Sequence, residues 1–288
     1  MRDLDWQIIV TLHQTMSITK TAELLFLTQP ALTKRIKAIE EELGTVLLVR
    51  GRKGSTFTPE GELIARKAQK VAASVQEAYD AASASVNGRQ GTLRLGCPYS
   101  FLRYVLPEVM ERYSGSYPEV RTDIHTMQSS DLVRFVEDGV LDVCFSRYMP
   151  EETPLESRLF SEDQACVICS HPFELAELAA MPYINYEKNA AMESALRTWW
   201  NERFLGEPDT RFRVTNSDIC ISLVQRGLGW GIVLDSRCLS HESGLYAKPI
   251  ELTDGTRLTK KTWLMYRPDA MVSPLIRNFI ASVAEENH

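Results

Sequence analysis

Residues 27–44, LTQPALTKRIKAIEEELG, combine an apolar stripe with a polar and basic face. The apolar residues recur four, three and four positions apart, at Leu32, Ile36, Ile39 and Leu43. This spacing predicts an α-helix with one buried side. The residues that fall off the stripe are Gln29, Pro30, Thr33, Lys34 and Lys37. Most of them can hydrogen-bond a polar partner, and a solvated surface is the alternative for this segment taken alone.

A second basic cluster follows at residues 50–54, RGRKG, and contains Arg50, Arg52 and Lys53. It lies between two β-prone runs, so it predicts the tip of a hairpin, or wing, that contacts phosphates or a minor groove. A solvated turn is the alternative. Residues 20–70 hold ten Lys or Arg and six acids, a net +4, whereas the 288-residue chain carries −6 and the remainder therefore −10. This asymmetry favours a nucleic-acid partner for the basic segment.

Capping residues predict the elements that position these groups. Ser17 and Thr28 can each accept a backbone N–H at a helix start. Pro30 fits a first helical turn, and Gly44 can end the same helix. A helix, a tight turn and a second helix with a polar-basic leading face form the helix-turn-helix arrangement.

One long helix is predicted from Pro59, with Thr58 as its cap. Apolar and small residues recur along it at steps of four and three: Ile64, Ala68, Val71, Val75, Ala78, Ala82 and Ser85. This is the spacing of a coiled-coil seam. We therefore expect the helix to pair with a second copy of the chain, with packing on its own domain as the alternative.

The run SITKTAELLFLTQPALTKRIKAIEEELGTVLLVRGRKGSTFTPEGE resembles the winged helix-turn-helix of LysR-type transcriptional regulators. The shared features are Ala22 with Leu25, the TQPALT helix start, IEEELG, a terminal Arg50 and TPEG. Thr21 stands where alanine is usual, and Leu48 where phenylalanine is usual. The resemblance covers almost the whole chain and implies a regulator that binds double-stranded promoter DNA, forms a homodimer or homotetramer, and contacts RNA polymerase.

The resemblance also implies roles for the basic residues. It places a major-groove reading face at Gln29, Pro30, Thr33 and Lys34. Glutamine can pair bidentately with adenine, and lysine can reach the acceptors of guanine. Contacts with phosphates or the minor groove are assigned to Lys37, Arg50, Arg52 and Lys53.

From residue 91 onward, strand-like and helix-like segments alternate, which predicts parallel doubly wound sheets. The resemblance implies the periplasmic-binding-protein-like effector domain of this family, with two α/β subdomains and two crossovers. Within VQRGLGWGIVL, Trp230 stands where an aliphatic residue is usual, and Asp235 follows where a proline is usual. The predicted division is a winged helix-turn-helix at 1–58, a linker helix at 59–90 and an effector domain at 91–288. Subdomain I takes about 91–160 and 266–288, and subdomain II about 161–265.

Ligands of open α/β folds bind beyond the carboxyl ends of strands, beside helix N-termini. The candidate effector residues there are Tyr99, Ser100, Phe101, Gln128, Ser129, Ser130, Ser146, Arg147, Asn216, Ser217 and Trp230. Helix capping is the alternative for several of the serines. Arg147 would suit a small carboxylate or other anion unless it pairs with Glu151 or Glu152. A neutral or aromatic effector stacking near Tyr99, Phe101 or Trp230 stays open.

Six cysteines are scattered along the chain, and Cys166 with Cys169 form a CxxC inside an apolar strand-like run. A zinc site would need a second ligand pair at suitable spacing, and the sequence has none. We expect reduced core cysteines. The alternative is a redox-responsive regulator of the same fold with a cysteine switch. The peroxide-sensing branch of the family places its cysteines in the segment matching 190–214, which lacks them here, so Cys220 and Cys238 are the remaining candidates.

Several other classes are disfavoured. No apolar run approaches the roughly 20 residues of a membrane span, and the acidic start MRDLDWQIIV does not resemble a signal peptide, so we expect a cytoplasmic protein. The sequence has no P-loop or dinucleotide fingerprint, and GLGWG lacks the serine of a nucleophile elbow. We therefore expect no enzyme activity, no cofactor and no metal.

Overall fold

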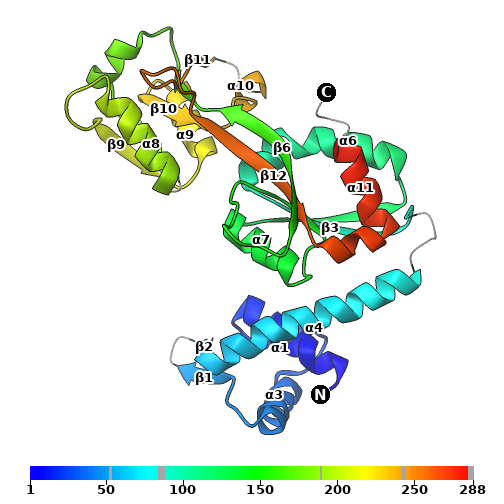
Figure 1. Cartoon of the computed structure of the whole chain (residues 1–288). Coiled ribbons are helices and arrows are strands. Elements are labelled where there is room, and N and C mark those ends of the chain that lie inside the picture. The colour runs from blue at the N-terminus through cyan, green and yellow to red at the C-terminus, as the bar shows by residue number, and fades with distance from the viewer. Residues whose placement is uncertain (52–53, 84–87, 189, 242–243, 285–288) are drawn as a thin grey trace.

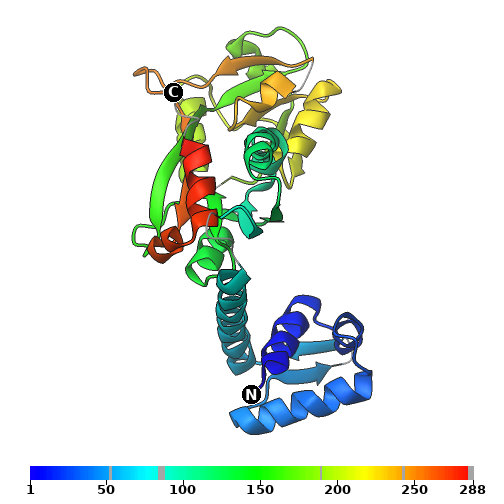
Figure 2. The ribbon, with the colours of Figure 1, turned by 90° about the vertical axis from the view of Figure 1, so that its right-hand side faces the viewer.

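The computed structural model of the chain describes residues 1–51, 54–83, 88–188, 190–241 and 244–284 (Figure 1). A mainly helical N-terminal part leads into one long helix and then into an α/β part with two sheets. Figures 1 and 2 show the long helix between the other two parts. Within the described ranges, no helix is long and apolar enough to cross a membrane.

The N-terminal part packs three helices against a small hairpin. Its elements are α1 (Asp3–Thr15), α2 (Ile18–Leu24), α3 (Gln29–Leu43), β1 (Leu48–Gly51) and β2 (Gly54–Phe57). The predicted caps are confirmed, because the Ser17 hydroxyl accepts from the Lys20 N–H and the Thr28 hydroxyl from the Ala31 N–H. The stripe of α3 is buried at Leu32, Ile36 and Ile39, against Ile8, Ile9 and Leu12 of α1. Gly44 ends α3 with a φ of 66°, a conformation that suits glycine.

The long helix α4 (Pro59–Ser83) begins as predicted, with the Thr58 hydroxyl accepting from the Gly61 N–H at 2.9 Å. Its first turns pack on the N-terminal part of the same chain. Ala65 and Ala68 are fully buried there, and Ile64 packs against the same cluster. The expectation that the whole seam pairs with a second copy is therefore wrong at Ile64 and Ala68, where packing within the domain satisfies the apolar surface. Ser85 and the side chain of Ala82 lie outside the described residues.

The first sheet has the strand order β4-β3-β5-β12-β6. Its strands are β3 (Gly91–Cys97), β4 (Val120–Thr126), β5 (Val143–Ser146), β6 (Glu156–Gln164) and β12 (Thr259–Tyr266). The strands β3, β4 and β5 are parallel, whereas β12 runs antiparallel to β5 and β6. Its helical segments are α5 (Tyr99–Tyr104), α6 (Leu106–Ser116), α7 (Ser129–Glu137), the 3₁₀ turn η2 (Pro268–Val272) and α11 (Pro274–Ala284).

The second sheet has the strand order β11-β7-β10-β8-β9. Its strands are β7 (Cys166–Cys169), β8 (Tyr183–Tyr186), β9 (Thr210–Val214), β10 (Trp230–Val233) and β11 (Tyr246–Pro249). The strands β8, β9 and β10 are parallel, and β7 and β11 are antiparallel additions. Both sheets are therefore mixed rather than purely parallel. The chain crosses between them after β6 and again before β12, as the two predicted crossovers require.

Helices cover opposite faces of the second sheet. Here α9 (Ser217–Gln225) packs on the face that carries Ile184 and Gly231, and α8 (Ala190–Asn201) belongs to the cluster with Tyr183, Trp230 and Ile232. A Cβ at Gly231 would lie 2.5 Å from the Cys220 sulfur, so α9 approaches the sheet closely at that point. A 3₁₀ turn η1 (Leu175–Ala180) and the short helix α10 (Cys238–His241) complete this half.

Candidate DNA-reading face and effector site

The start of α3 presents the predicted reading face to solvent. Gln29, Pro30, Lys34 and Lys37 are exposed, and Thr33 is half-buried. The buried stripe on the other side of α3 fixes the rotation of the helix, so these residues share the free side. The face therefore has the donors and acceptors that base edges require.

A buried ion pair holds α3 against α1. The guanidinium of Arg35 donates to both oxygens of Asp5, from Nε to Oδ1 and from Nη2 to Oδ2, each at 2.5 Å. The Asp5 side chain is fully buried, and Arg35 beside it lowers the pKa of that carboxyl below its ordinary 3.8. The Arg2 N–H adds a third hydrogen bond at 2.6 Å. Arg35 thus positions the reading helix rather than facing DNA.

A second carboxylate links α3 to the wing. Oε1 of Glu40 accepts from the backbone N–H groups of Leu47 and Leu48, at 2.8 and 3.3 Å. The hairpin pairs Arg50 with Ser55 in the backbone register. Arg52 and Lys53 lie outside the described residues, as does the side chain of Arg50. Glu40 therefore fixes the base of the wing relative to the reading helix.

In the α/β part, Arg147 brings several predicted residues together. It follows β5, and its Nη1 donates to the Ser100 hydroxyl at 2.9 Å. Its backbone N–H donates to the Ser129 hydroxyl at 3.2 Å. Its Nη2 donates to Oδ2 of Asp235 at 2.6 Å. Since Asp235 follows β10 of the second sheet, Arg147 joins the strand ends of both sheets.

We call this region the junction, and define it by Ser100, Ser129, Arg147, Asp218 and Asp235. A second set of contacts crosses it, because the Tyr104 hydroxyl at the end of α5 donates to Oδ1 of Asp218 on α9 at 2.8 Å. Arg103 lies 3.4 Å from the same carboxylate. Oδ2 of Asp218 and Nε of Arg147 are buried without a hydrogen-bond partner among the described residues. A bound polar molecule would have groups of both kinds to contact.

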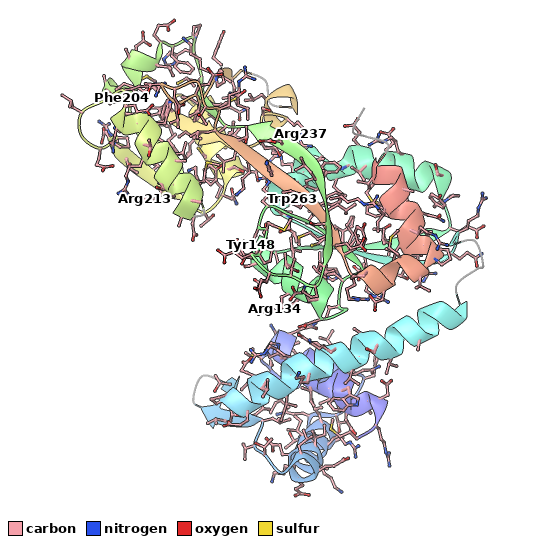
Figure 3. All side chains as sticks on the ribbon, in the orientation of Figure 1. Arg134, Tyr148, Phe204, Arg213, Arg237 and Trp263 are labelled. Atoms are coloured by element: carbon pink, nitrogen blue, oxygen red, sulfur yellow. The ribbon has the colours of Figure 1, made fainter. Side chains whose placement is uncertain are left out.

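Asp235 also anchors a second arginine. Arg237 donates from Nε to Oδ1 of Asp235 at 3.1 Å and from Nη2 to Oδ2 of Asp163 at 2.9 Å. Figure 3 labels Arg237 beside the end of β6 that carries Asp163. Burial, followed by the charge of Asp235, raises the pKa of Asp163. Arg147, Asp235, Arg237 and Asp163 thus form a chain of two guanidinium groups and two carboxyl groups. Their opposite charges compensate one another.

Comparison with known proteins decides the family. Residues 4–62 match the model of the bacterial regulatory helix-turn-helix protein, lysR family, and residues 87–287 match the LysR substrate binding domain. The chain belongs to the LysR family. It is a DNA-binding transcriptional regulator with an effector-binding domain, and it is not an enzyme.

Individual relatives agree with this assignment. The uncharacterized HTH-type transcriptional regulator YraN of Bacillus subtilis is 31% identical and covers 97% of this chain and 96% of its own. A hydrogen peroxide-inducible genes activator of Dickeya chrysanthemi is 27% identical, over 80% of this chain and 77% of that protein. The crystal structure of full-length CbnR with its target DNA shares the fold, with a TM-score of 0.73, 18% identity and 99% of each chain covered.

The structure places the remaining candidates of this LysR-family regulator as follows. Tyr99, Gln128 and Ser130 are exposed at the starts of α5 and α7. Ser146 is fully buried and donates to the backbone oxygens of Ser129 and Tyr148. The N-cap positions are held by Pro98, Gln128 and Asn216 rather than by Ser100, Ser130 and Ser217. Of the three, Asn216 caps with its side chain, whose Oδ1 accepts from the Ile219 N–H at 3.0 Å.

Three side chains differ from the predicted arrangement. Arg147 pairs with Asp235, not with Glu151 or Glu152. Phe101 is fully buried, with its ring stacked 4.2 Å from that of Phe145, so it belongs to the core. Trp230 lies on the α8 face of the second sheet and stacks on Tyr183 at 4.2 Å, apart from the junction.

Sequence reasoning missed three residues that surround the junction: Tyr104, which bonds Asp218, Arg237, which bonds Asp235, and Asp163, which bonds Arg237. It noted Asp235 only as a departure from the family pattern. That departure was the available signal, because an acidic residue in place of proline at a strand end needs a partner once it is buried.

All six cysteines of this regulator are buried, and none of them forms a disulfide. Burial raises the pKa of Cys97 and Cys169 to about 12 and that of Cys220 to about 11. A thiol with a raised pKa holds little thiolate at neutral pH and reacts slowly. These environments disfavour the cysteine switch.

Proposed function

We propose that this regulator reads promoter DNA with the start of α3 and the wing, and that a small-molecule effector at the junction alters that reading. Major-groove contacts are assigned to Gln29, Pro30, Thr33 and Lys34. Contacts with phosphates or the minor groove are assigned to Lys37, Arg50, Arg52 and Lys53. The exposure of the α3 face opposite a buried stripe supports this assignment.

The effector site is proposed at the strand ends that meet at the junction. Its candidate residues are Tyr99, Ser100, Gln128, Ser129, Ser130, Ser146, Arg147, Asn216 and Ser217. One observation carries the proposal: Arg147 contacts groups of both sheets and still has a buried, unpartnered Nε. A ligand that competes for Arg147 would change the contact between the sheets.

A small carboxylate or other anion is the effector class that Arg147 favours, because a guanidinium binds carboxylates through paired hydrogen bonds. Asp235 already accepts a hydrogen bond from Nη2 of that guanidinium. The effector would therefore either displace Asp235 from Nη2 of Arg147 or accept a hydrogen bond from its Nε. Either change would shift the balance between an open and a closed arrangement of the sheets.

The proposed assembly is a homodimer or homotetramer that presents two reading heads and contacts RNA polymerase, in the cytoplasm where promoter DNA is found. The proposed division keeps the winged helix-turn-helix at 1–58, the linker helix at 59–90 and the effector domain at 91–288. Val71, Val75 and Ala78 of α4 are the described seam positions that are left for pairing, because Ile64 and Ala68 pack on α1.

The test is a footprint of the purified protein on the DNA upstream of its own gene, at two salt concentrations and with a panel of small carboxylates. We expect a dyad-symmetric protected region that weakens steeply with salt, because phosphate contacts release counterions. We expect one carboxylate to change the footprint, and an Arg147→Gln variant to bind DNA without that response. A response that persists in Arg147→Gln would contradict the junction as the effector site.

A further inference from the structure

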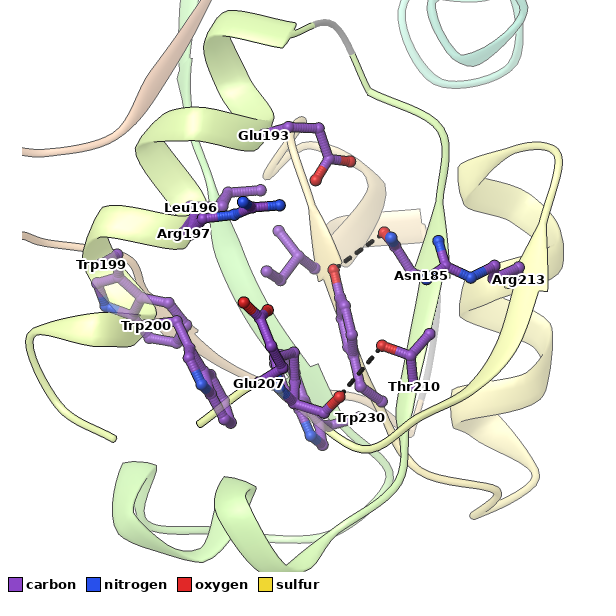
Figure 4. Close-up of a pocket in the computed structure, with 13 residues that line it drawn as sticks. Asn185, Glu193, Leu196, Arg197, Trp199, Trp200, Glu207, Thr210, Arg213 and Trp230 are labelled. Carbon is purple, nitrogen blue, oxygen red and sulfur yellow. Dashed lines mark hydrogen bonds between the residues drawn. The ribbon is translucent and has the colours of Figure 1, made fainter. Parts of the chain in front are cut away.

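A separate cavity of about 160 Å³ lies in the second sheet on the face covered by α8 (Figure 4). The apolar side chains that line it, Leu196 and Ile232 among them, are mainly aromatic and almost fully buried: Tyr183 is 7% exposed, Trp200 5% and Trp230 1%. Tyr183 and Trp230 stack at 4.2 Å, and Trp230 lies parallel to Trp200 at 5.5 Å, with 7° between their planes. The volume is close to the roughly 150 Å³ of an engineered protein cavity that admits benzene. A small organic molecule would therefore fit.

The rim of this cavity carries charges of both signs. Glu193 and Arg197 come from α8, Arg213 from β9, and Glu207 from the segment between them. None of these four groups forms an ion pair or a hydrogen bond with any residue that the structure describes. Figure 4 shows Glu193, Arg197, Glu207 and Arg213 around the same opening. Opposite charges that stay unpaired around one cavity can each take a ligand group.

An amide adds a neutral donor to this wall. Oδ1 of Asn185 accepts from the Tyr183 hydroxyl at 3.1 Å and from Nζ of Lys188 at 2.9 Å. These two bonds orient the amide, and its NH₂ group makes no hydrogen bond to a described residue. The cavity therefore offers two carboxylates, two guanidinium groups and one amide donor, next to a nearly buried stack of aromatic rings.

We propose that this cavity is a second ligand site, distinct from the junction, for a small zwitterion such as a free amino acid or a betaine. The ammonium end binds at the carboxylate of Glu193 or Glu207. The carboxylate end binds Arg197 or Arg213. A purely anionic ligand would leave both glutamates unpaired, and a purely cationic one would leave both arginines unpaired.

The site connects to the junction side of the sheet through β8. Tyr183 lies in the cavity wall, Asn185 follows it, and Lys188 links Asn185 to the backbone oxygen of Tyr186 at 2.9 Å. Strand β8 ends at the edge where α9 begins after β9. A ligand that hydrogen-bonds the Asn185 amide would thus contact β8, the strand whose end lies beside the start of α9 and the junction.

The test is calorimetric titration of the full chain with each common amino acid and with glycine betaine, together with tryptophan fluorescence. Three of the five tryptophans line the cavity, so a bound ligand should change the emission. We expect at least one zwitterion to bind, with affinity reduced tenfold or more in Glu207→Gln and in Arg213→Gln. Both residues are exposed, so these variants should fold, which circular dichroism would check.

Two controls locate the binding. Glu187→Gln alters an exposed glutamate outside the cavity wall and should bind as the parent protein does. Arg147→Gln removes the proposed effector residue of the junction and should also retain binding. Loss of binding in Arg147→Gln with retention in the cavity variants would place the ligand at the junction and overturn the proposal. Failure of every zwitterion to bind the parent protein would overturn it as well. Amino acids and betaines are separate arms, so the result distinguishes a primary from a methylated ammonium group.

Discussion

Replacing Asp235 with asparagine tests whether the ion pair with Arg147 holds the two sheets together. The pair is short, at 2.6 Å, and the Arg147 and Asp235 side chains are only 15% and 6% exposed. Removing one member of a buried pair typically costs 3–5 kcal/mol, because the other charge is left without compensation. Two features reduce that cost here. Arg147 keeps its hydrogen bond to the Ser100 hydroxyl, and Arg237 keeps its ion pair with Asp163. We therefore expect Asp235→Asn to lower the free energy of unfolding by about 2–3 kcal/mol.

A double-mutant cycle with Arg147→Gln separates the pair from the other contacts of each residue. Arg147→Gln leaves the Asp235 carboxylate with Arg237 as its remaining ion-pair partner, whereas Asp235→Asn leaves the Arg147 guanidinium without a carboxylate. The coupling energy of contacting charged residues should be about 1–3 kcal/mol. The assay is urea unfolding of the full chain, monitored by the tryptophans of the second sheet. The N-terminal part, which carries Trp6, would be followed separately if the two transitions do not coincide.

The matched control is the ion pair of Arg211 with Asp209, whose side chains are 63% and 54% exposed. An exposed pair of this kind contributes at most about 1 kcal/mol, so Asp209→Asn should change stability little. If the Arg147–Asp235 coupling is no larger than that of the control pair, the sheets are held together by their shared apolar core instead. The reasoning about the junction would then be refuted.

Three further predictions concern the reading head and the thiols. Gln29→Ala should relax sequence preference, whereas Lys53→Ala should weaken binding to all DNA similarly and flatten its salt dependence; equal losses on specific and random DNA in both variants would contradict this division. Arg35 lowers the pKa of Asp5 below 3.8, so the ion pair stabilises the fold above that pH and its contribution is lost as the pH falls through the lowered pKa. When unfolding is measured against acid pH, Asp5→Asn should lose less stability than the parent protein. Identical acid profiles would refute the role of the pair. A thiol reagent should modify the six buried cysteines slowly in the native protein and rapidly in urea, and one fast-reacting native thiol would revive the redox alternative.

Short-range features of this chain were predictable because their chemistry is local. Ser17, Thr28 and Thr58 cap helices that start within three residues of them, and Gly44 adopts the positive φ that ends α3. The apolar spacing of α3 also fixes which side of that helix faces outward. The segment SFLRYVLPEVMERYS, residues 100–114, predicts one helix, which is wrong because α5 and α6 separate at Val105. Pro107 lacks the N–H that a continuous helix would need there.

Sequence by itself thus determined the family, the order of the elements and the strand ends at which polar residues gather. Tertiary structure decided which of those residues meet. Arg147 reaches Asp235 across 88 residues, and Tyr104 reaches Asp218 across 114. Trp230 follows a glycine-rich turn in the sequence, but its face of the sheet depends on how β10 pairs with β7 and β8. Side chains alternate between the faces of a strand, so a local pattern does not show which face a helix will cover. For that reason Trp230 lies in the α8 cavity, while Asp235, five residues later, lies at the junction.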